Sequence, residues 1–537
     1  MDIRKMNLTL LLLTPFIIMS HLHAQSNPSH NNGLIVAKEI PVGLILDLGS
    51  WVGKTVHSCI TMAISDFYAQ NSHYKKRIVL HTRDSQGEPL HALSAALDLL
   101  QNNKVQAIVG LETPMEAKFL APLGDKAKVP ILSFTTIPSS SIKYPYLIQI
   151  TEDETTHFKG VATIVESFKW RGVIFINEDT DHGREILPYL IESFLEKNLH
   201  IAHRTAISPS ANDHQILQEL HKHRSMQAAI FIVHMSPSLA SRLFLNVKRL
   251  GMMSGGYAWI ITETTMNLLH SADSEVIKSL QGVLGFKSYI PSSRELHNFT
   301  RRWKHELYTK DPTMEVNDLN VFGIWAYDGI WALAKAVERV GTESPPVTNN
   351  QGTGLRLFDL AEISVSQSGR TLLNEILQTK FRGLSGEFQI MNGKLKSQEF
   401  EIVNVIGKGE RTVGFWTSTD GIKREMYRSV HGLETIIWPG GSTIIPKGWM
   451  MSMSGKKLRV GVPTNPGFKE LVHVDQNQAN ETTVTGFCIA VFKAAIEALP
   501  FEVPYEFIPF VGADGKNLGT YNDLTDQVYL QVCLVPS

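Results

Sequence analysis

The chain has 537 residues, of which 43% are hydrophobic and 19% charged, and its formal net charge is -1. This balance is typical of well-packed globular domains and, at this length, indicates more than one of them. With no excess of basic residues, the composition gives no electrostatic reason to expect nucleic acid as a partner. The three cysteines, Cys59, Cys488 and Cys533, lie far apart and predict no disulfide framework.

The chain opens with a short apolar run. Arg4 and Lys5 precede apolar residues from Leu8 to Met19, and Ala24 offers a small residue for cleavage. The run is too short to cross a bilayer as a helix, so residues 1–24 are predicted to be a secretory signal peptide. No later stretch holds about 18 consecutive apolar residues, and we therefore expect no membrane helix in the mature chain.

Passage through the secretory pathway would make two short motifs meaningful. Asn298-Phe299-Thr300 and Asn480-Glu481-Thr482 match the acceptor pattern for N-linked sugar. Asn298 and Asn480 are therefore predicted glycosylation sites. Asn27 is excluded because a proline follows it.

Short β-rich runs alternate with longer helical periods over the first half of the chain. The expected strands are 40–47, 77–82, 107–110, 130–134, 172–177 and 228–233, and the expected helices are 54–70, 89–102, 114–127, 184–197 and 238–250. Near-continuous apolar strands such as 173–176 are typical of a parallel sheet covered on both faces. The pattern predicts a doubly wound α/β fold.

The alternation weakens after Ile290. Residues 294–308 and 321–340 are predicted to be consecutive helices, and the Gly-, Pro-, Ser- and Asn-rich stretch 341–353 is predicted to be an exposed loop. A β-rich segment follows at 388–416.

A change in composition near residue 440 indicates a domain boundary. Residues 441–455 are predicted to be a linker, and a strand at 457–462, a helix at 486–499 and a strand at 505–510 predict a new α/β unit after it.

The segment from Gly49 to Thr55 reads Gly-Ser-Trp-Val-Gly-Lys-Thr and lies where a phosphate-binding loop would lie, between a predicted strand and a helix. It has one residue too few between its glycines, and a shortened loop turns too few backbone N–H groups toward a phosphate. An ordinary strand-to-helix turn is the favoured interpretation.

Hydroxyl and carboxylate side chains directly follow several predicted strands. The candidates are Thr113, Ser133, Thr135, Thr136 and Asp179. Ligands of open α/β sheets lie outside the carboxyl ends of the strands, so these residues are predicted to line a cleft that binds a small polar molecule. The same residue types also cap helices, and Thr113 before Pro114 fits a cap equally well.

The sequence offers no starting point for catalysis or metal binding. His221 and His223 are two residues apart, so on a helix they would point to different faces, and we expect them to be solvated. There is no pair of neighbouring cysteines, no His-Glu-x-x-His run and no nucleophile elbow. We therefore expect neither an enzyme nor a bound cofactor or metal.

Several motifs, taken together and in this order, closely resemble the plant glutamate receptor-like channels of the ionotropic glutamate receptor family. They are residues 50–54 leading to 62–68, Phe381-Arg382-Gly383-Leu384-Ser385-Gly386, Ile437-Trp438-Pro439-Gly440, 446–449, 458–463, 486–489, 499–501 and 503–507. The resemblance covers essentially the whole mature chain. It implies a two-lobed periplasmic-binding-protein type I domain followed by part of a type II ligand-binding domain.

The resemblance also implies domain limits. Residues 36–440 correspond to the two lobes, 456–530 to part of the first lobe of the amino-acid-binding domain, and 531–537 diverge from the family. In the family, a ligand-holding arginine, the membrane segments and a second lobe come later, so we expect this chain to have no pore of its own. Ala490 stands where the family usually has Asp.

The function that the resemblance implies is the extracellular region of a ligand-gated cation channel subunit. Such a region acts in sensing an amino acid or other small polar ligand and in assembly with full-length receptor subunits, as a homo- or hetero-oligomer. The full-length family lies in the plasma membrane, and this chain is expected to be secreted or lumenal. The alternative is a free secreted binding protein that captures a small molecule and signals through another receptor.

Overall fold

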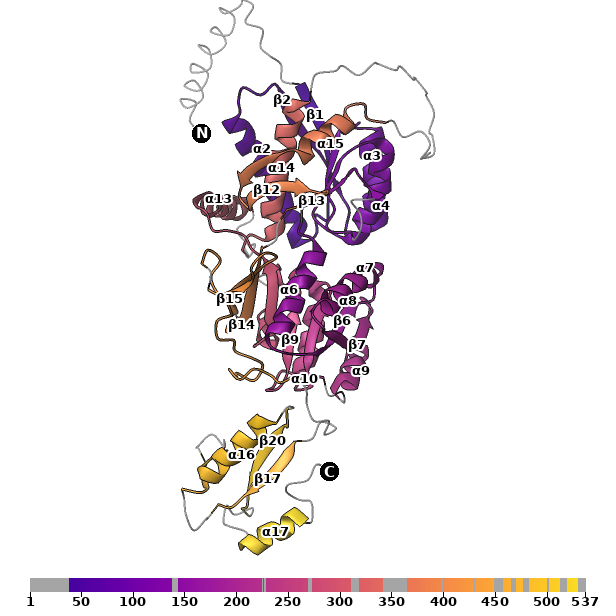
Figure 1. The fold of residues 1–537 in the computed structure, drawn as a ribbon. Coiled ribbons are helices and arrows are strands. Elements are labelled where there is room, and N and C mark those ends of the chain that lie inside the picture. Colours follow the sequence, from indigo (N-terminus) through magenta and orange to yellow (C-terminus); the bar gives the residue numbers. More distant parts are fainter. Residues whose placement is uncertain are drawn as a thin grey trace, which may run out of the picture.

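Three α/β units follow one another along the molecule (Figure 1). The computed structural model describes residues 38–137, 143–224, 226, 228–268, 273–310, 318–340, 365–396, 399–428, 430–448, 457–464, 470–476, 482–499, 502–511 and 519–529. The predicted signal peptide 1–24, the predicted loop 341–353, Asn480 and the divergent tail 531–537 lie outside these residues.

The first lobe is built round an eight-stranded sheet with the order β11-β12-β13-β5-β4-β3-β1-β2. Its strands are β1 (Lys38–Leu46), β2 (Lys76–Asp84), β3 (Ala107–Gly110), β4 (Ile131–Ser133), β5 (Leu147–Gln149), β11 (Lys380–Gly383), β12 (Gly386–Met391) and β13 (Lys394–Leu395). Its helices are α2 (Trp51–Gln70), α3 (Pro89–Gln101), α4 (Pro114–Ala127), α13 (Arg294–Lys310), α14 (Val321–Arg339) and α15 (Gly369–Leu377). Strands β1 to β5 pair in parallel, and β12 is antiparallel to both of its neighbours.

The second lobe has a sheet with the order β16-β15-β14-β10-β9-β8-β6-β7. Its strands are β6 (Gly172–Glu178), β7 (His200–Ile207), β8 (Ile230–His234), β9 (Ala258–Ile261), β10 (Leu284–Ser288), β14 (Glu399–Ile406), β15 (Gly409–Thr417) and β16 (Gly421–Lys423). Its helices are α6 (Glu154–Ser167), α7 (Asp181–Glu185), α8 (Leu187–Leu195), α9 (Asp213–Arg224), α10 (Pro237–Arg249), α11 (Glu263–Met266) and α12 (Ser274–Ser279). The order β7-β6-β8-β9-β10 repeats the order β2-β1-β3-β4-β5 of the first lobe.

Each sheet is covered on both faces, as the apolar strands predict. On β1, Val42 and Leu44 pack into the core formed with α2 and α14, whereas Ile45 packs into the core formed with α3 and α4. On β6, Ile174 and Phe175 likewise enter two different cores. Alternate residues of one strand thus face opposite layers, which requires the near-continuous apolar run seen in the sequence. The predicted two-lobed α/β fold is confirmed.

Two predicted helices have different limits in the structure. The predicted helix 184–197 is two helices, because Pro188 has no N–H to continue the first and instead occupies the first turn of α8. Helix α2 begins at Trp51, three residues before its predicted start, because Ser50 caps it.

The chain passes between the two lobes three times, after β5, after β10 and after β13. The predicted β-rich segment 388–416 is therefore divided, since β12 and β13 complete the first sheet whereas β14 and β15 belong to the second. One crossing is held by an ion pair in which Lys394 Nζ lies 2.7 Å from Oδ1 of Asp153, the cap of α6.

Residues 436–448, which include the start of the predicted linker 441–455, lie against the second lobe. Trp438 is buried and packs edge-to-face on Trp170, with ring centroids 5.6 Å apart. The indole N–H of Trp170 donates to the Pro446 carbonyl at 2.6 Å, and the Ala229 amide donates to the Gly448 carbonyl at 3.2 Å. Two family motifs, 437–440 and 446–449, thus supply contacts that fix this segment to the lobe.

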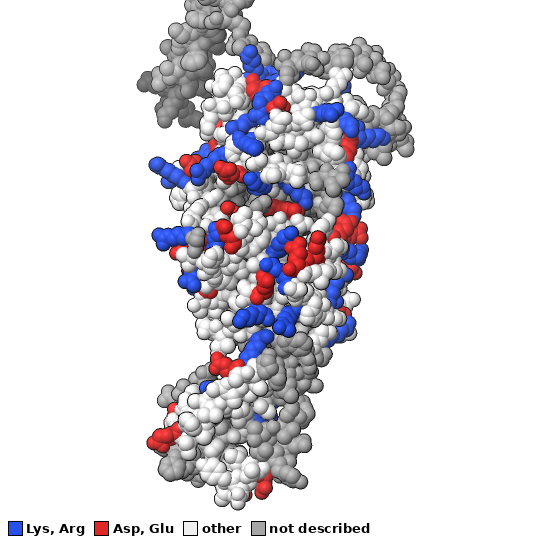
Figure 2. All heavy atoms as spheres, in the orientation of Figure 1, with Lys and Arg blue, Asp and Glu red and all other residues white. Residues whose placement is uncertain are grey.

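The third unit is small and has little core. It consists of β17 (Leu458–Val462), β18 (His473–Gln476), β19 (Thr482–Thr485), α16 (Phe487–Ala498), β20 (Tyr505–Pro509) and α17 (Tyr521–Tyr529). Its buried cluster is Val462, Val472, Val484 and Ile489. Phe487 and Val491 of α16 are exposed, and the face of this unit seen in Figure 2 carries few charged side chains. That it is an incomplete type II lobe stays a prediction.

A buried carboxylate holds the turn between β11 and β12. Oδ1 of Asp328, on α14, accepts the Leu384 amide at 2.8 Å, and Oδ2 accepts the amide and the hydroxyl of Ser385 at 2.8 Å and 2.6 Å. A Cβ on Gly383 would lie 2.3 Å from the same carboxylate. These contacts explain why the family motif at 381–386 has a glycine and a serine at these positions.

We predict that replacing Asp328 by Ala lowers the free energy of unfolding of the chain by on the order of 3 kcal/mol, because one buried amide, one partly buried amide and a hydroxyl lose their acceptor. Ser385→Ala removes only one donor and should cost on the order of 1 kcal/mol. Urea denaturation followed by tryptophan fluorescence measures both.

Asp526→Ala is the matched control, since Asp526 is exposed on α17. A loss for Asp328→Ala no larger than that of the control would show that the turn holds without its carboxylate.

Candidate ligand cleft between the two lobes

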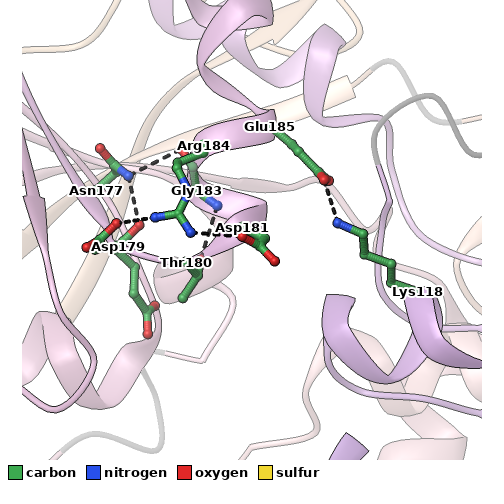
Figure 3. A network of polar contacts seen from close by, with 9 residues as sticks. Lys118, Asn177, Asp179, Thr180, Asp181, Gly183, Arg184 and Glu185 are labelled. Atoms are coloured by element: carbon green, nitrogen blue, oxygen red, sulfur yellow. Dashed lines mark hydrogen bonds and ion pairs between the residues drawn. The ribbon is translucent and has the colours of Figure 1, made fainter.

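Helix α4 of the first lobe and helix α7 of the second lobe are joined by an ion pair. Lys118 of α4 and Glu185 of α7 form an ion pair with 2.5 Å between Nζ and Oε1 (Figure 3). Both side chains are about 39% exposed, so the pair bridges the lobes at the surface. The candidate cleft is the space beside this ion pair, because ligands of open α/β sheets lie at such strand-to-helix turns.

The segment that resembles a phosphate-binding loop is an ordinary turn, as predicted. Ser50 Oγ accepts the Gly53 amide at 2.8 Å and caps α2. A Cβ on Gly53 would lie 2.0 Å from the Asp47 carbonyl oxygen, so close packing of helix on strand explains this glycine. The Glu112 carboxylate already accepts the Asp47 amide at 3.1 Å and the Ser50 hydroxyl at 3.2 Å. The Glu112 carboxyl group thus lies where a phosphate would have to approach.

The second lobe has a turn built in the same way. Thr180 Oγ1 accepts the Gly183 amide at 3.1 Å and caps α7. A Cβ on Gly183 would lie 2.1 Å from the Glu178 carbonyl oxygen. Asn177 Nδ2 donates to the carbonyls of Glu178 and Gly183 at 2.8 Å and 3.2 Å and so braces the turn (Figure 3). Each lobe thus has a strand-to-helix turn of the same construction.

Thr113, a predicted ligand contact, forms a capping box at the start of α4. Its hydroxyl accepts the Glu116 amide at 3.2 Å, and the Glu116 carboxylate accepts the Thr113 amide at 3.0 Å. The cap that the sequence also allowed is therefore present. Ligand contact at Thr113 stays a prediction.

Ser133 is the last residue of β4, and Thr135 and Thr136 lie in the turn that follows it. Ser133 is fully buried, its hydroxyl donates to the Thr135 carbonyl at 3.2 Å, and its oxygen accepts the Thr135 amide at 3.2 Å. Thr136 is buried and Thr135 is partly buried. Ser133 thus supports the shape of the turn, which leaves Thr135 as the residue of the three with solvent access.

Asp179 lies in an exposed ion network of the second lobe. Arg184 places Nη1 at 2.5 Å from Asp179 Oδ1 and Nη2 at 2.8 Å from Asp181 Oδ1 (Figure 3). The Asp179 side chain therefore faces Arg184 within its own lobe. Its role in ligand binding stays a prediction.

Glu112 was missed by the sequence reasoning. Burial raises its pKa from 4.5 to about 7, and the neighbouring carboxylates of Glu116 and Asp47 act in the same direction, against the hydrogen bonds from Asp47 and Ser50. The sequence did carry a signal, because Glu112 comes two residues after the end of β3 and lies beside Thr113.

His221 and His223 differ in their burial. His221 is exposed as expected, but the expectation was wrong for His223, which is 1% exposed and whose Nε2 lies 2.8 Å from Thr205 Oγ1. Burial and the nearby His203 lower the pKa of His223 to about 4. Tertiary packing against β7 accounts for the difference.

Within the described ranges, no group of three His, Cys, Asp or Glu side chains is arranged to hold a metal ion. Among those same residues, no helix is both long enough and apolar enough to span a membrane. Asn298, a predicted glycosylation site, is exposed on α13.

Comparison with known proteins agrees with this geometry. Residues 55–408 match the receptor family ligand binding region. The chain belongs to this family. It is 40% identical to glutamate receptor 2.3 of Arabidopsis thaliana over 517 residues, which are 94% of this chain and 57% of that protein. It is 41% identical to Arabidopsis glutamate receptor 1.2 over 503 residues, 92% of this chain and 55% of that protein.

These relatives identify the chain as an amino-terminal region of the plant glutamate receptor-like type, and it spans little more than half of their length. Solved structures show the fold. A solute-binding protein of an ABC transporter from Rhodopseudomonas palustris, in complex with 3,4-dihydroxybenzoic acid, has a TM-score of 0.55 at 17% identity and covers 72% of this chain and 98% of its own. A substrate-binding protein from Sphaerobacter thermophilus has a TM-score of 0.55 at 15% identity, with 70% and 96% covered.

We predict that Glu112→Gln flattens the pH dependence of stability between pH 4.5 and about 7. The folded chain holds the Glu112 proton more tightly than the unfolded chain, so this contribution is full below pH 4.5 and is lost as the pH rises through about 7. The loss for the unsubstituted chain is on the order of 2–3 kcal/mol. Urea denaturation at a series of pH values measures it.

Glu295→Gln is the matched control because Glu295 is exposed on α13. Parallel pH profiles for Glu112→Gln and the unsubstituted chain would contradict the assigned role of Glu112.

Proposed function

We propose that this chain is the ligand-sensing extracellular region of a glutamate receptor-like cation channel subunit. Its two lobes close on an amino acid or another small polar ligand, and the same body pairs with further receptor subunits. Family membership and the exposed sequon at Asn298 support an extracellular role reached through the secretory pathway.

An exposed ion pair between the lobes is the observation that carries the sensing proposal. Lys118 of α4 and Glu185 of α7 come from different lobes. The three chain crossings act as the hinge of such a molecule. An exposed pair contributes no more than about 1 kcal/mol, so it positions the lobes without locking them.

We predict that reversing either charge, in Lys118→Glu or Glu185→Lys, weakens ligand binding about two- to fivefold, because closure then brings like charges together. The double variant restores the attraction and should restore the affinity. Isothermal titration of the purified chain with each of the twenty amino acids measures the effect, and X-ray scattering with and without ligand reports closure.

Lys222→Glu is the matched control, since its partner Glu219 lies on the same helix, α9, away from the cleft. If no small ligand binds, or if the double variant binds as weakly as the single ones, closure across this pair is refuted.

Exposed apolar side chains support the pairing of subunits. Leu90 on α3 and Leu195 on α8 are 67% and 66% exposed, and Phe119 on α4 and Ile191 on α8 are about 40% exposed. These helices lie along one side of both lobes (Figure 1). We infer that a second copy of the chain, or a full-length subunit, covers this surface.

We predict that Leu90→Asp and Leu195→Asp each shift the chain from dimer to monomer in sedimentation experiments, because a carboxylate cannot be buried there without a partner. Tyr308→Asp is the control: Tyr308 is 59% exposed but lies on α13, on the other side of the lobe. A chain that stays monomeric and fails to co-purify with any full-length relative would favour a free secreted binding protein instead.

A further inference from the structure

A cavity of about 280 Å³ lies beside the hinge, between the lobes. We call it the hinge pocket. Trp51 and Asn320 line it from the first lobe, Ser288 and Glu401 from the second, and Ile290 from the crossing between them. None of Thr113, Ser133, Thr135, Thr136 or Asp179 belongs to its lining. A ligand in the hinge pocket would touch both lobes and the segment that joins them.

Asn320 provides the polar group that needs a partner. It is 7% exposed and caps α14, with Oδ1 accepting the Gly323 amide at 3.0 Å. Its Nδ2 has no hydrogen-bond partner among the residues that the structure describes. A buried amide donor left without an acceptor costs about 1–3 kcal/mol. Because Asn320 belongs to the wall of the pocket, an acceptor inside the pocket can satisfy it.

The neighbouring polar side chains already have partners. Asn267 Nδ2 donates to Ser288 Oγ at 3.3 Å, and Asn267 Oδ1 accepts the Ser288 amide at 3.2 Å. Lys287 is paired with Glu410, and Glu401 accepts the hydroxyl of Thr412. Asn320 Nδ2 is therefore a buried donor of the lining whose hydrogen bond is not made among the described residues.

The other residues that line the hinge pocket indicate which kind of ligand fits it. Trp51, Leu296, Val321 and Ile324 make much of it apolar. The charged residues of the lining are Lys287, which is paired with Glu410, Asp318, which is paired with Lys304 at 2.6 Å, and Glu401. The Glu401 carboxylate repels a second carboxylate of a ligand and attracts an ammonium group. The volume suits a ligand smaller than a typical drug.

We propose that the hinge pocket binds an amino acid with a large apolar side chain, whose carboxylate accepts a hydrogen bond from Asn320 Nδ2. This rests on the proposed function and names its ligand class. The apolar side chain packs on Trp51 and its neighbours, and the ammonium group is favoured by the carboxylate of Glu401. Glutamate is disfavoured because its second carboxylate meets this same group.

The test is calorimetric titration of the purified chain with L-phenylalanine, L-leucine and L-glutamate. Phenylalanine and leucine should bind, and glutamate should bind at least tenfold more weakly. Asn320→Ser keeps the cap of α14, because serine is also a good N-cap, but removes the amide donor. It should weaken phenylalanine binding about tenfold or more, because the lost hydrogen bond is made to a charged group.

Two further variants keep the result interpretable. Asn212→Ser makes the same change at an exposed cap, where Asn212 Oδ1 accepts the Gln215 amide at 3.0 Å, and should bind phenylalanine normally. Ser292→Phe narrows the hinge pocket from an exposed position and should also block binding, even if Asn320→Ser does not fold.

The outcomes separate the two proposals. If glutamate binds more tightly than phenylalanine, or if Asn320→Ser and Ser292→Phe leave phenylalanine binding unchanged, the hinge pocket is not the site, although the chain still senses an amino acid. If no amino acid binds to any form of the chain, both proposals fail.

Discussion

Neither lobe is formed by one continuous stretch of the chain, because the chain crosses between the lobes three times and each sheet is completed by strands from residue 380 onward. The first sheet depends on the hairpin of β11 and β12, and that hairpin depends on Asp328. Burial raises the pKa of this carboxyl group to about 6, yet its three hydrogen bonds satisfy both oxygens. One side chain of α14 thus fixes where the chain turns before it returns to the second lobe.

The same kind of strand-to-helix turn occurs in both lobes. In each lobe a hydroxyl cap holds the amide of a glycine three residues on, at Ser50 and Gly53 and again at Thr180 and Gly183. In both cases a Cβ would strike the carbonyl oxygen at the end of the preceding strand. The helices therefore lie as close to their strands as the backbone allows. Such rigid edges suit a molecule in which the lobes move as bodies about a hinge.

The sequence predicted where helices and strands lie better than it predicted which strands pair with one another. Apolar runs such as 173–176 require a sheet covered on both faces, and this requirement is local, so the α/β fold followed from it. The division of 388–416 between the two sheets did not follow, because the sheet that a strand joins depends on neighbours that lie elsewhere in the sequence. His223 was misjudged for the same reason, since its burial depends on β7, which lies elsewhere in the sequence.

Prediction of the site residues from the sequence met a similar limit. Hydroxyl residues after strands were correctly placed at strand ends, but whether a hydroxyl faces a ligand or its own backbone depends on geometry. At Thr113 and Ser133 the backbone is the partner. Asn320, which lies before a helix and far along the chain, carried no such signal, because only the folded chain brings it beside Trp51 and Ser288. The residues that join the lobes are therefore the hardest to predict.

The second lobe and the third unit are joined through residues 446–448. Residues 436–448 are held to the second lobe through the carbonyls of Pro446 and Gly448. Between these two residues, Lys447 Nζ reaches the Ile496 and Leu499 carbonyls at the end of α16, at 2.9 Å and 2.6 Å. A cation at a helix C-terminus is stabilising, so this contact favours a fixed arrangement. A closure that displaces the second lobe would therefore displace α16 with it, because residues 446–448 are hydrogen-bonded to both.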